Sequence, residues 1–576
     1  MIKTRPFKPI FCSAKGDAPI SVRVFSRKTI TLIFLILLPY ITMAQDVGWK
    51  SQGANGTVAA GKPASVQAGL LMLKKGGNAA DAAVATILAE TITEEGDFCA
   101  GGEAALMFYN AKTGRVKVLS GQGEAPLSKT AIAWYMKNGI PLHNIKAAAV
   151  PAVIDLCVQA LKHYGTFSFA ETVAPALKLL ATGKRSWYKD LAGTYEKLVE
   201  AENNTTGSRL QKLQAVSDRF YRGDIADSLA NWYRKEGSFL TKKDLSHHVT
   251  EEEDPISVEY KGYTVYKCDT WTQGGVMLEA LQLLSHFNLK EMGYRSPTYI
   301  HIVTEALKLA LADRDAYYGD PAFVKVPIKG LLSDQYASLR FPLIDLSHSS
   351  KQARPGDPIH MKPLLDKGRY LPAPHGTTTC SVVDRWGNMV ACTPSGWGSD
   401  AGPAGSTGII HATRLISFNT MEGHPNCIAA GKRPRITLSP TMVVKNGKPV
   451  MAMSVEGGDE QDQTSLNLFL DIIDFGLSPD SATKAPRFAT NLHQDSFNPS
   501  KDRDSALPGK RILTINEGLD TAQLQALRQL GHTLVTTREA IGSPAVIYID
   551  STGMAYGGTD PKTPHYTGAL KAAIHP

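Results

Sequence analysis

The sequence predicts an α/β protein built from layers of helices and antiparallel sheets. Apolar residues recur at helical spacing over long stretches of the first half, whereas the part from about residue 377 onward is rich in β-forming runs joined by short turns. Helices and hairpins follow one another without the regular order of parallel βαβ units. A content of 43% hydrophobic and 20% charged residues excludes a mainly disordered chain.

Two helices open the predicted fold. The first begins at Ala64, has apolar residues at helical spacing, and ends before Gly76-Gly77. The second runs from Ala79 to about Glu90, and Asn78 precedes it as a candidate N-cap. Because the second helix is rich in alanine, we expect it to pack closely against its neighbours.

The next segments alternate between helix and strand. The predictions are a strand at Ala105–Tyr109, mainly helix over residues 150–245, a short strand pair over 258–268, and a long helix near Thr298–Tyr317. The segment Lys351–Gly376 is polar and contains several Pro and Gly residues. We expect it to be an exposed connector.

Three β-hairpins are predicted after residue 377. The strongest turn signal is Asn446-Gly447, because this dipeptide favours the tight turn that matches the twist of paired strands. The predicted strand pairs are Cys380–Asp384 with Met389–Thr393, Met442–Lys445 with Val450–Val455, and Val546–Asp550 with Met554–Tyr556.

Residues 1–44 have the pattern of a secretory signal. Arg27-Lys28 precede the apolar run Ile30–Leu38, and the small-residue site Thr42-Met43-Ala44 follows it. The apolar run is too short to span a membrane. We therefore predict cleavage after Ala44 and export, either to the periplasm or as a secreted protein. The alternative is an uncleaved membrane anchor, and an upstream start site would explain the long segment 1–24.

The net charge of +8 lies mostly in this leader. Residues 1–44 hold seven Lys or Arg and one Asp, so the rest of the chain carries 55 basic and 53 acidic residues. A nearly neutral body gives no electrostatic reason to expect a nucleic-acid partner.

Six of the seven cysteines follow the leader. None forms a C-x-x-C pair or has zinc spacing with histidine, and most lie in apolar stretches. We expect them to be small core residues. Export would permit disulfides, but the sequence does not pair them.

Several common catalytic motifs are absent. The chain has no H-E-x-x-H, no G-x-S-x-G and no G-x-x-x-x-G-K-[ST] motif. His247-His248 is an isolated pair, and we predict a solvated loop there in preference to a metal site.

A candidate nucleophile lies between the connector and the first predicted hairpin, in Gly376-Thr377-Thr378-Thr379. A Thr hydroxyl needs a base. If the chain is cut before a Thr, the new α-amine can be that base, since its ordinary pKa is about 7.7–8.0. Gly376 would leave the scissile carbonyl accessible. On local sequence alone, the alternative of a structural Thr-rich strand start is favoured.

A candidate oxyanion site is Gly457-Gly458, which follows a predicted strand directly. Backbone N–H groups at such a turn can stabilise an oxyanion. The alternative is an ordinary strand-to-helix turn, which this pattern alone favours.

Seven segments, taken in order, resemble the gamma-glutamyltransferases (gamma-glutamyltranspeptidases), and the resemblance covers about residues 53–568. The matching segments are TVAAGKPASVQAGLLMLKKGGNAADAAVAT at 57–86, VPAVIDLCVQALKHYG at 150–165, FYRGDIADSLA at 220–230, EALKLALADRDAYYGDPAFVKVP at 305–327, TTTCSVVDRWGNMVACT at 377–393, GKRPRITLSPTMVV at 431–444 and GGDEQDQ at 457–463. Each segment alone is modest, but their order and spacing are specific.

The resemblance implies an N-terminal nucleophile hydrolase with a four-layer αββα sandwich fold. Such a precursor cuts itself before a Thr, here between Gly376 and Thr377. The implied parts are the signal at 1–44, a large subunit at 45–376 and a small subunit at 377–576, which stay associated as one intertwined catalytic domain. No metal and no organic cofactor is implied.

The resemblance also implies roles near the nucleophile. Gly457 and Gly458 would hold the oxyanion, and Ser395 stands where the family has a Thr that orients the nucleophile. A plain turn residue after Pro394 is the alternative for Ser395. Thr379 replaces the His of the family's usual Thr-Thr-His, which is not the nucleophile.

The match breaks at four candidate substrate-binding positions. Gln122 stands where the family has an Arg for the α-carboxylate, and Gln lacks both the charge and the two-pronged geometry of Arg. Glu422 stands at an Asp of the α-amino clamp, Trp397 at an Asn, and Ile436-Thr437 at a Ser-Ser pair.

Charged replacements for the lost contacts are available in the sequence. The candidates for an ammonium group are Glu422, Asp459 and Glu460, and those for a carboxylate are Arg433 and Arg435. The alternative for the segment 431–435 is a solvated loop, which we favour. Trp397 and Ile436 predict a more apolar pocket wall than the family has.

The leading hypothesis is therefore an exported, self-processing Thr amidohydrolase or acyltransferase. Its substrate would be a γ-glutamyl amide of the glutathione type, with water or an amine as acceptor. One alternative is a Thr amidohydrolase for a non-glutamyl acyl amide. Another is a different class of protein, an inactive binding protein on the same scaffold. Processing at Thr377 would distinguish the enzymes from the binding protein.

Overall fold

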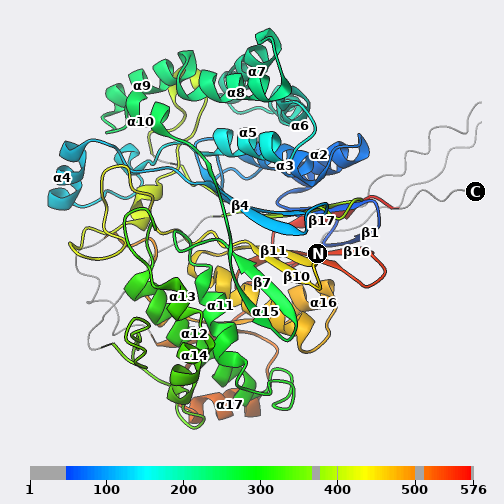
Figure 1. Cartoon of the computed structure of the whole chain (residues 1–576), viewed down its shortest axis with the longest axis vertical. Helices are drawn as coiled ribbons and strands as arrows, with labels where there is room; N and C mark the ends of the chain where they lie inside the picture. The colour runs from blue at the N-terminus through cyan, green and yellow to red at the C-terminus, as the bar shows by residue number, and fades with distance from the viewer. Residues whose placement is uncertain (1–46, 366–376, 399, 500–510, 572–576) are drawn as a thin grey trace, which may run out of the picture. The chain divides into compact units, whose positions relative to one another are not determined.

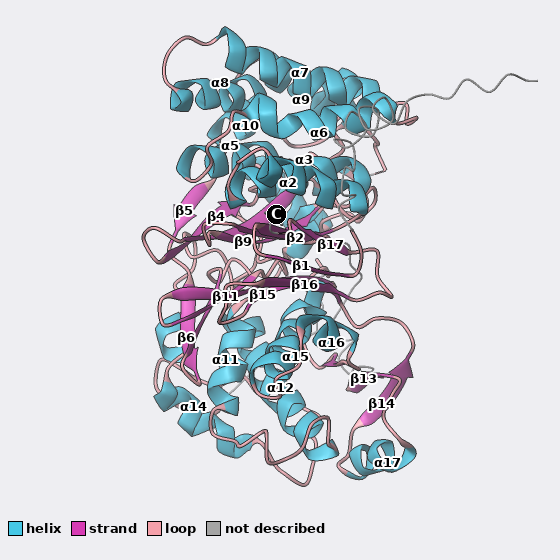
Figure 2. Ribbon diagram, turned by 90° about the vertical axis from the view of Figure 1, so that its right-hand side faces the viewer, coloured by secondary structure: helices cyan, strands magenta, loops and turns pink. Residues whose placement is uncertain are grey.

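Two seven-stranded antiparallel sheets face each other, and helices cover the outer face of each (Figure 1 and Figure 2). This computed structural model describes residues 47–365, 377–398, 400–499 and 511–571. The arrangement confirms the four-layer αββα prediction. Within the described ranges, no helix has the length and apolar character needed to cross a membrane. The predicted signal at 1–44 and the predicted cleavage residue Gly376 lie outside the described residues.

The first sheet contains strands from both sides of the predicted cleavage site. Its order is β17 (Tyr566–Ala569), β2 (Gly56–Ala60), β8 (Cys380–Asp384), β9 (Met389–Ser395), β3 (Glu103–Asn110), β4 (Arg115–Gly121) and β5 (Glu251–Glu253). The hairpin β8–β9 is thus held between β2 and β3.

The second sheet also contains strands from both sides of the predicted cleavage site. Its order is β1 (Lys50–Gly53), β16 (Ala555–Thr559), β15 (Ser543–Ile549), β11 (Lys448–Glu456), β10 (Thr441–Lys445), β7 (Tyr263–Lys267) and β6 (Ile256–Tyr260). A separate three-stranded sheet contains β12 (Phe488–Thr490), β13 (Ile512–Asn516) and β14 (Thr533–Thr537).

Helices from the first half of the chain lie on the outer side of the first sheet. Those that pack directly against its strands are α2 (Pro63–Lys74), α3 (Ala79–Thr93) and α5 (Val153–His163). Those that pack on these helices and on one another, farther from the sheet, are α6 (Phe169–Thr182), α7 (Tyr188–Asn204), α8 (Arg209–Tyr221), α9 (Asp224–Glu236) and α10 (Lys242–His247). Asn78 caps α3 as predicted, and its partner in the capping box is Asp81.

Later helices lie on the outer side of the second sheet. Those that pack directly against its strands are α11 (Gly275–Leu284), α15 (Gln461–Ile473) and α16 (Pro479–Lys484). Those that lie farther out are α12 (Pro297–Tyr317), α14 (Asp334–Arg340) and α17 (Thr521–Gln529). The short helix α13 (Ile328–Leu331) and α4 (Lys129–Asn138) belong to smaller apolar clusters.

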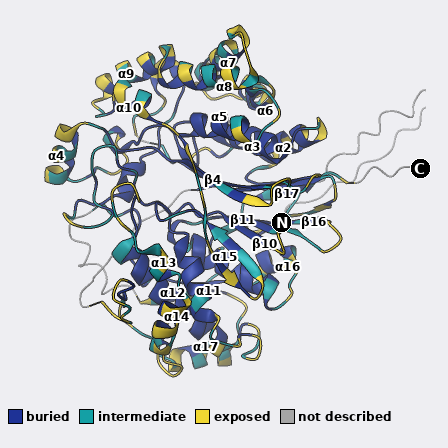
Figure 3. Ribbon diagram, viewed as in Figure 1, coloured by how far each residue is buried: buried dark blue, intermediate teal, exposed yellow. Residues whose placement is uncertain are grey.

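Alternate residues of the central strands enter two different cores, because side chains alternate along a strand. On β9, Val390 and Cys392 pack against the helices, whereas Met389 and Ala391 face the second sheet. Figure 3 shows the resulting burial, with the central strands and the helix sides that face them in dark blue. This alternation decides which side chains at the strand ends face one another between the sheets.

The predicted elements are largely confirmed. The helices after Ala64 and Ala79, the strand pair over 258–268, the long helix ending at Tyr317 and all three hairpins are present. Five cysteines are buried thiols, as expected for core residues: Cys99, Cys157, Cys268, Cys380 and Cys392.

Two loop predictions were wrong. His248 is buried, and its Nδ1 lies 2.9 Å from Glu124 Oε2, so only His247 of that pair is exposed. The described part of the predicted connector is also not fully exposed. Gly356 is buried in it and donates its N–H to Asp313 at 2.7 Å, which ties the connector to α12.

Candidate active site

The predicted nucleophile stands in a row of four residues that crosses the end of the first sheet. Glu103 is paired with Ser395 between β3 and β9, and Thr378 N donates to Pro394 O at 2.9 Å, which extends the β8–β9 ladder to Thr377 opposite Ser395. Gln122 follows β4 beside Glu103. Strand alternation directs all four side chains toward the second sheet.

The Thr377 and Ser395 hydroxyls meet within this row. Thr377 Oγ1 donates to Ser395 Oγ at 3.3 Å, and both residues are buried. Thr378 points the other way, since a Cβ on Gly61 at the start of α2 would lie 3.1 Å from its Oγ1. The structure therefore brings the predicted nucleophile and its predicted orienting hydroxyl together.

A buried arginine, Arg414, connects Ser395 to Glu103. Its Nη2 donates to Ser395 Oγ at 2.6 Å and its Nε donates to Glu103 Oε1 at 2.5 Å. Burial raises the pKa of Glu103, and the charge and hydrogen bond of Arg414 oppose that shift. The Arg414 guanidinium also lies 4.7 Å from the Trp397 ring and 5.6 Å from the Phe497 ring.

The Gly457-Gly458 turn lies at the end of β11, in the sheet that faces the row. Thr393 Oγ1 on β9 is 2.8 Å from Ser454 Oγ on β11, so the two strands run close together just before Ser395 and the turn. Both glycines have positive φ, 141° and 54°, which favours glycine at these positions. Gly457 is the N-cap and Gly458 the first residue of the 3-10 helix Gly458–Glu460, and backbone donors at a helix start have no intrahelical partners.

A buried polar network holds this turn from behind. Gln273 Nε2 donates to Gly458 O at 2.9 Å, and Arg314 Nη1 donates to Gln273 Oε1 at 2.7 Å and to Asp459 Oδ1 at 2.5 Å. Asp459 also accepts from the N–H of Ser496 at 3.0 Å. These contacts give the Asp459 carboxylate a structural role, and its use as an ammonium ligand stays a prediction.

Two carboxyl groups flank the turn. Burial raises the pKa of Glu456 to about 8, and the nearby Asp97 and Glu94 add to the shift. Burial also raises the pKa of Glu460 to about 7, although the Gly542 N–H, 3.2 Å from its Oε2, lowers it. At pH 7 the Glu456 carboxyl is therefore mostly protonated, whereas the Glu460 carboxyl is about half ionised.

Two of the four predicted substrate-binding positions lie near the row. Gln122 is fully buried and its side-chain amide donates a hydrogen bond to Pro434 O, while its Oε1 has no hydrogen-bond partner among the described residues. Trp397 is half-buried and packs edge-on against Phe497, with ring centroids 5.2 Å apart. The role of Trp397 in an apolar pocket wall stays a prediction.

The other two positions have different surroundings. Glu422 is exposed, and no contact with the row is described for it. Thr437 is fully buried, and its neighbour Ile436 donates its N–H to Trp271 O at 2.9 Å. These observations leave both assignments as predictions.

The preference for a solvated loop at 431–435 was wrong. Arg435 is buried and donates to Ser496 Oγ at 2.8 Å. Arg433 lies 3.3 Å from Glu124, whose pKa falls to about 2 because His248 and Arg433 outweigh the effect of burial. Both arginines therefore have structural partners.

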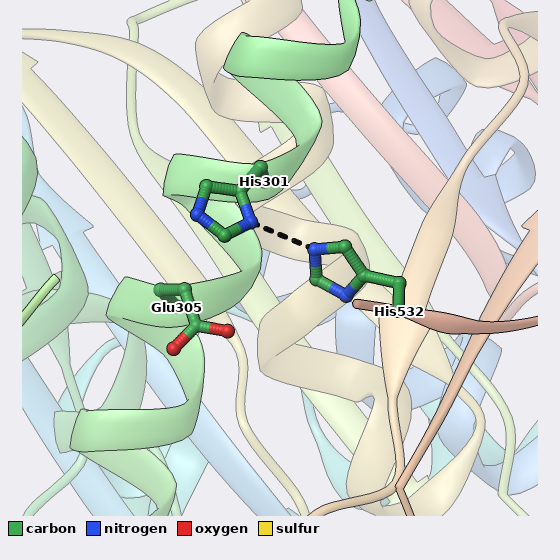
Figure 4. Close-up of side chains that lie close together, drawn as sticks. All are labelled: His301, Glu305 and His532. Carbon is green, nitrogen blue, oxygen red and sulfur yellow. Dashed lines mark hydrogen bonds between the residues drawn. The ribbon is translucent and has the colours of Figure 1, made fainter. Parts of the chain in front are cut away.

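One group of histidine and carboxylate side chains in the described ranges has the spacing of a metal site: His301, Glu305 and His532 (Figure 4). His301 Nε2 lies 2.7 Å from the Asp345 carbonyl, to which it must donate, so Nδ1 of the neutral ring accepts a hydrogen bond from His532 Nε2 at 2.8 Å. Lys308 and Arg354 both pair with Glu305, at 2.7 and 3.1 Å. Because the Glu305 carboxylate already pairs with two cations, these contacts indicate a hydrogen-bonded network in preference to a metal site.

Glu103, Arg414 and Phe497 were not among the predicted site residues. A signal was present for the first two, because each is a charged residue within an otherwise apolar run, and such residues are rarely buried unless they are paired. Their pairing depends on the register of β3 and β9, so the sequence did not predict that they meet.

Two helix-covered antiparallel sheets, with a Thr at the start of a central strand, define an N-terminal nucleophile hydrolase fold. The gamma-glutamyltranspeptidase family model matches residues 65–186 and 184–570. The chain belongs to this family, and it is an enzyme of the N-terminal nucleophile hydrolase type.

Individual relatives span almost the whole chain. A glutathione hydrolase proenzyme of Escherichia coli (strain K12) is 32% identical over 90% of this chain and 92% of its own length. An acylase ACY 1 proenzyme of Pseudomonas sp. (strain SE83) is 27% identical over 88% and 92%. The crystal structure of a cephalosporin acylase from Bacillus halodurans has a TM-score of 0.75 and 28% identity, covering 93% of this chain and 98% of that one.

Proposed function

We propose that the protein is a self-processing Thr amidohydrolase or acyltransferase with Thr377 as its nucleophile. The observation that carries the proposal is the buried hydrogen bond from Thr377 Oγ1 to Ser395 Oγ, on the face of the first sheet that looks toward Gly457-Gly458. A Thr hydroxyl oriented in this way lacks only a base. Cleavage before Thr377 would supply that base as the free α-amine.

Processing starts with an attack of Thr377 Oγ on the Gly376 carbonyl carbon. The C–N bond between Gly376 and Thr377 breaks as the C–O bond forms, and the proton from Oγ ends on the new amine. Water then hydrolyses the ester, which leaves a carboxylate on Gly376 and a free hydroxyl on Thr377. The products are a large subunit, 45–376, and a small subunit, 377–576.

Turnover repeats this chemistry on an external amide. The Thr377 amine takes the proton of its own hydroxyl, and Oγ attacks the acyl carbonyl. Gly457 and Gly458 N–H groups stabilise the oxyanion, a contribution of about 3–4 kcal/mol per donor in other enzymes. The leaving amine carries the proton away, and water or a second amine releases the acyl group from Thr377.

Intact mass spectrometry of the purified protein tests the nucleophile. The wild type should give two masses that correspond to a cut between Gly376 and Thr377, while Thr377→Ala should give one. Thr378→Ala is the matched control, because Thr378 faces the helices, and it should still be cut. A folded wild type that stays in one piece would contradict the proposal and favour an inactive binding protein.

We further propose that the acyl donor is a γ-glutamyl amide of the glutathione type. The relatives named glutathione hydrolase support this choice, since one of them is 32% identical over 90% of the chain. Gln122 can still offer its unpartnered Oε1 to the donor, although it supplies no positive charge.

A non-glutamyl acyl amide is the second candidate. Trp397 and Phe497 give the site an aromatic wall, and Gln122 lacks the charge that a free carboxylate would need. Relatives named acylase also cover most of the chain. A panel of γ-glutamyl, aliphatic and aromatic acyl anilides separates the candidates, because the ratio of their kcat/KM values measures the preference directly.

We also propose that the protein is exported and that residues 1–44 are removed. The pattern of charge, apolar run and small residues in the leader supports this proposal. N-terminal sequencing of the large subunit from cell fractions tests it. A mature chain that begins at Gln45 is expected, and retention of residues 1–44 in the purified protein would contradict the proposal.

A further inference from the structure

The Glu103–Arg414 ion pair lies in the candidate active site, but the proposed reaction steps give it no role. Arg414 comes from the short 3-10 helix Arg414–Ser417, outside the sheet, and reaches the ends of two neighbouring strands. Its Nε bonds to Glu103 on β3 and its Nη2 bonds to Ser395 on β9. All three residues are buried.

Arg414 is itself held on several sides. Glu103 fixes one edge of the guanidinium, and the Trp397 and Phe497 rings lie within 4.7 and 5.6 Å of it. Cation–π contacts of this kind are stronger where water is excluded. Its Nη1 is buried and has no hydrogen-bond partner among the described residues, so these residues do not satisfy all the donors of the guanidinium.

The hydrogen bond from Arg414 also defines what Ser395 can do. A serine oxygen has two acceptor sites and one proton. Arg414 Nη2 uses one acceptor site and the Thr377 hydroxyl uses the other. A charge-assisted bond of this kind is stronger than one between neutral groups, so it restricts the rotation of the Ser395 side chain and thereby the position of the Thr377 Oγ atom.

We propose that Glu103 and Arg414 are positioning residues that hold Ser395, and through it the Thr377 nucleophile, in the reactive orientation. This inference rests on the proposed function, because it assumes that Thr377 is the nucleophile. Lysine cannot replace Arg414 fully, since an ammonium is a point charge on a flexible stem and does not present the rigid fork that bonds Glu103 and Ser395 at once.

The test compares two double variants that each remove one buried ion pair without leaving a lone charge. The site variant is Glu103→Gln with Arg414→Gln. The control variant is Arg295→Gln with Asp471→Asn, which removes a buried pair of similar length, 2.6 Å, between the loop before α12 and α15. The measurements are the unfolding temperature, the rate of processing by intact mass, and kcat and KM for the anilide that the wild type hydrolyses best.

The site variant should process at least about tenfold more slowly than the wild type, and its kcat should fall by a similar factor while KM stays within about twofold. The control variant should lose comparable thermal stability and keep both rates within about twofold. Arg414→Lys should fall between the wild type and the site variant. A purely structural role would lower stability in both double variants and slow neither reaction selectively.

Two results would overturn the inference in distinguishable ways. A processed wild type together with a site variant that is processed at the wild-type rate would refute the positioning role alone. A folded wild type that is never processed would refute the proposed function and, with it, this inference. If the site variant does not fold, the intermediate rate of Arg414→Lys decides, and an unchanged rate in that variant refutes the positioning role.

Discussion

Glu456 is a single residue whose ionisation links the site to pH. Burial and the nearby Asp97 and Glu94 raise its pKa from 4.5 to about 8 in the folded protein. Between these two values the folded chain binds more protons at this residue than the unfolded chain does. The contribution of Glu456 to the free energy of unfolding is therefore full below about pH 4.5 and is lost as the pH rises to about 8.

Replacing Glu456 by Gln should weaken this pH dependence, because the amide keeps the shape of the side chain and does not titrate. In a Thr377→Ala background, which keeps the chain in one piece, the free energy of unfolding from urea titrations should fall less between about pH 5.5 and 8.5 than in the parent. The expected difference is on the order of 2 kcal/mol. Equal slopes in the two proteins would contradict the prediction.

At the residue scale, the sequence predicted some of the site and not the rest. Thr377, Ser395 and the two glycines were proposed from local pattern and family resemblance, and the hydroxyls of Thr377 and Ser395 do meet. Arg414 was not predicted, because its ion-pair partner Glu103 lies 311 residues earlier in the chain. Only the pairing of β3 with β9 places Glu103 beside Ser395.

The turn at the end of β11 is the element on which oxyanion stabilisation would depend. Gly457 has a φ of 141°, and a Cβ added to it would lie 3.1 Å from the Gly542 Cα. Gly457→Ala should therefore shift the turn and lower the rates of processing and turnover by about 10²- to 10³-fold, as the loss of one oxyanion donor does in other enzymes. Single-turnover assays and intact mass measure the two rates.

Gly447→Ala is the matched control at the other end of the same strand. Gly447 also has a positive φ, 72°, but a Cβ added there meets no atom within 4 Å. Both substitutions therefore strain the backbone, and only the first disturbs the site. Equal losses of activity in the two variants would mean that general destabilisation, and not the oxyanion turn, explains the effect.

At the element scale, the hairpins and helices with local signals were predicted well. Asn446-Gly447 and Asn78 determine a turn and a helix start through their own backbone and side-chain chemistry, so a short stretch of sequence is sufficient. The burial of His248 and Arg435 was missed because it depends on Glu124 and Ser496, which are distant in sequence.

Across the whole molecule, the two predicted subunits share both sheets. Strand β8 lies between β2 and β9, and β10 pairs with β7, so neighbouring strands come from opposite sides of the predicted cut. After processing, the two fragments should elute together in size-exclusion chromatography and separate only in denaturant. Separation of the fragments in plain buffer would contradict this topology.

Thiol reactivity tests both the burial of the core and the removal of the leader. Five cysteines are buried, and burial raises the pKa of each of them, so among the six cysteines of the described residues only the half-buried Cys427 should react quickly with a thiol reagent in the native protein. In denaturant, six thiols should react if the leader with Cys12 is gone and seven if it remains. Fast reaction of several thiols in the native protein would contradict the burial.

The predicted small subunit begins with three consecutive threonines. Because side chains alternate along a strand, neighbouring threonines face opposite sides of the sheet. Thr377 meets Ser395, whereas the Thr378 hydroxyl lies beside Gly61 on the helix side. Because β8 is fixed by pairing with β2 and β9, deleting one threonine would leave the remaining two at the positions of Thr378 and Thr379, and no threonine would then lie opposite Ser395. The site is therefore more sensitive to a change in chain length at this point than to many substitutions around it.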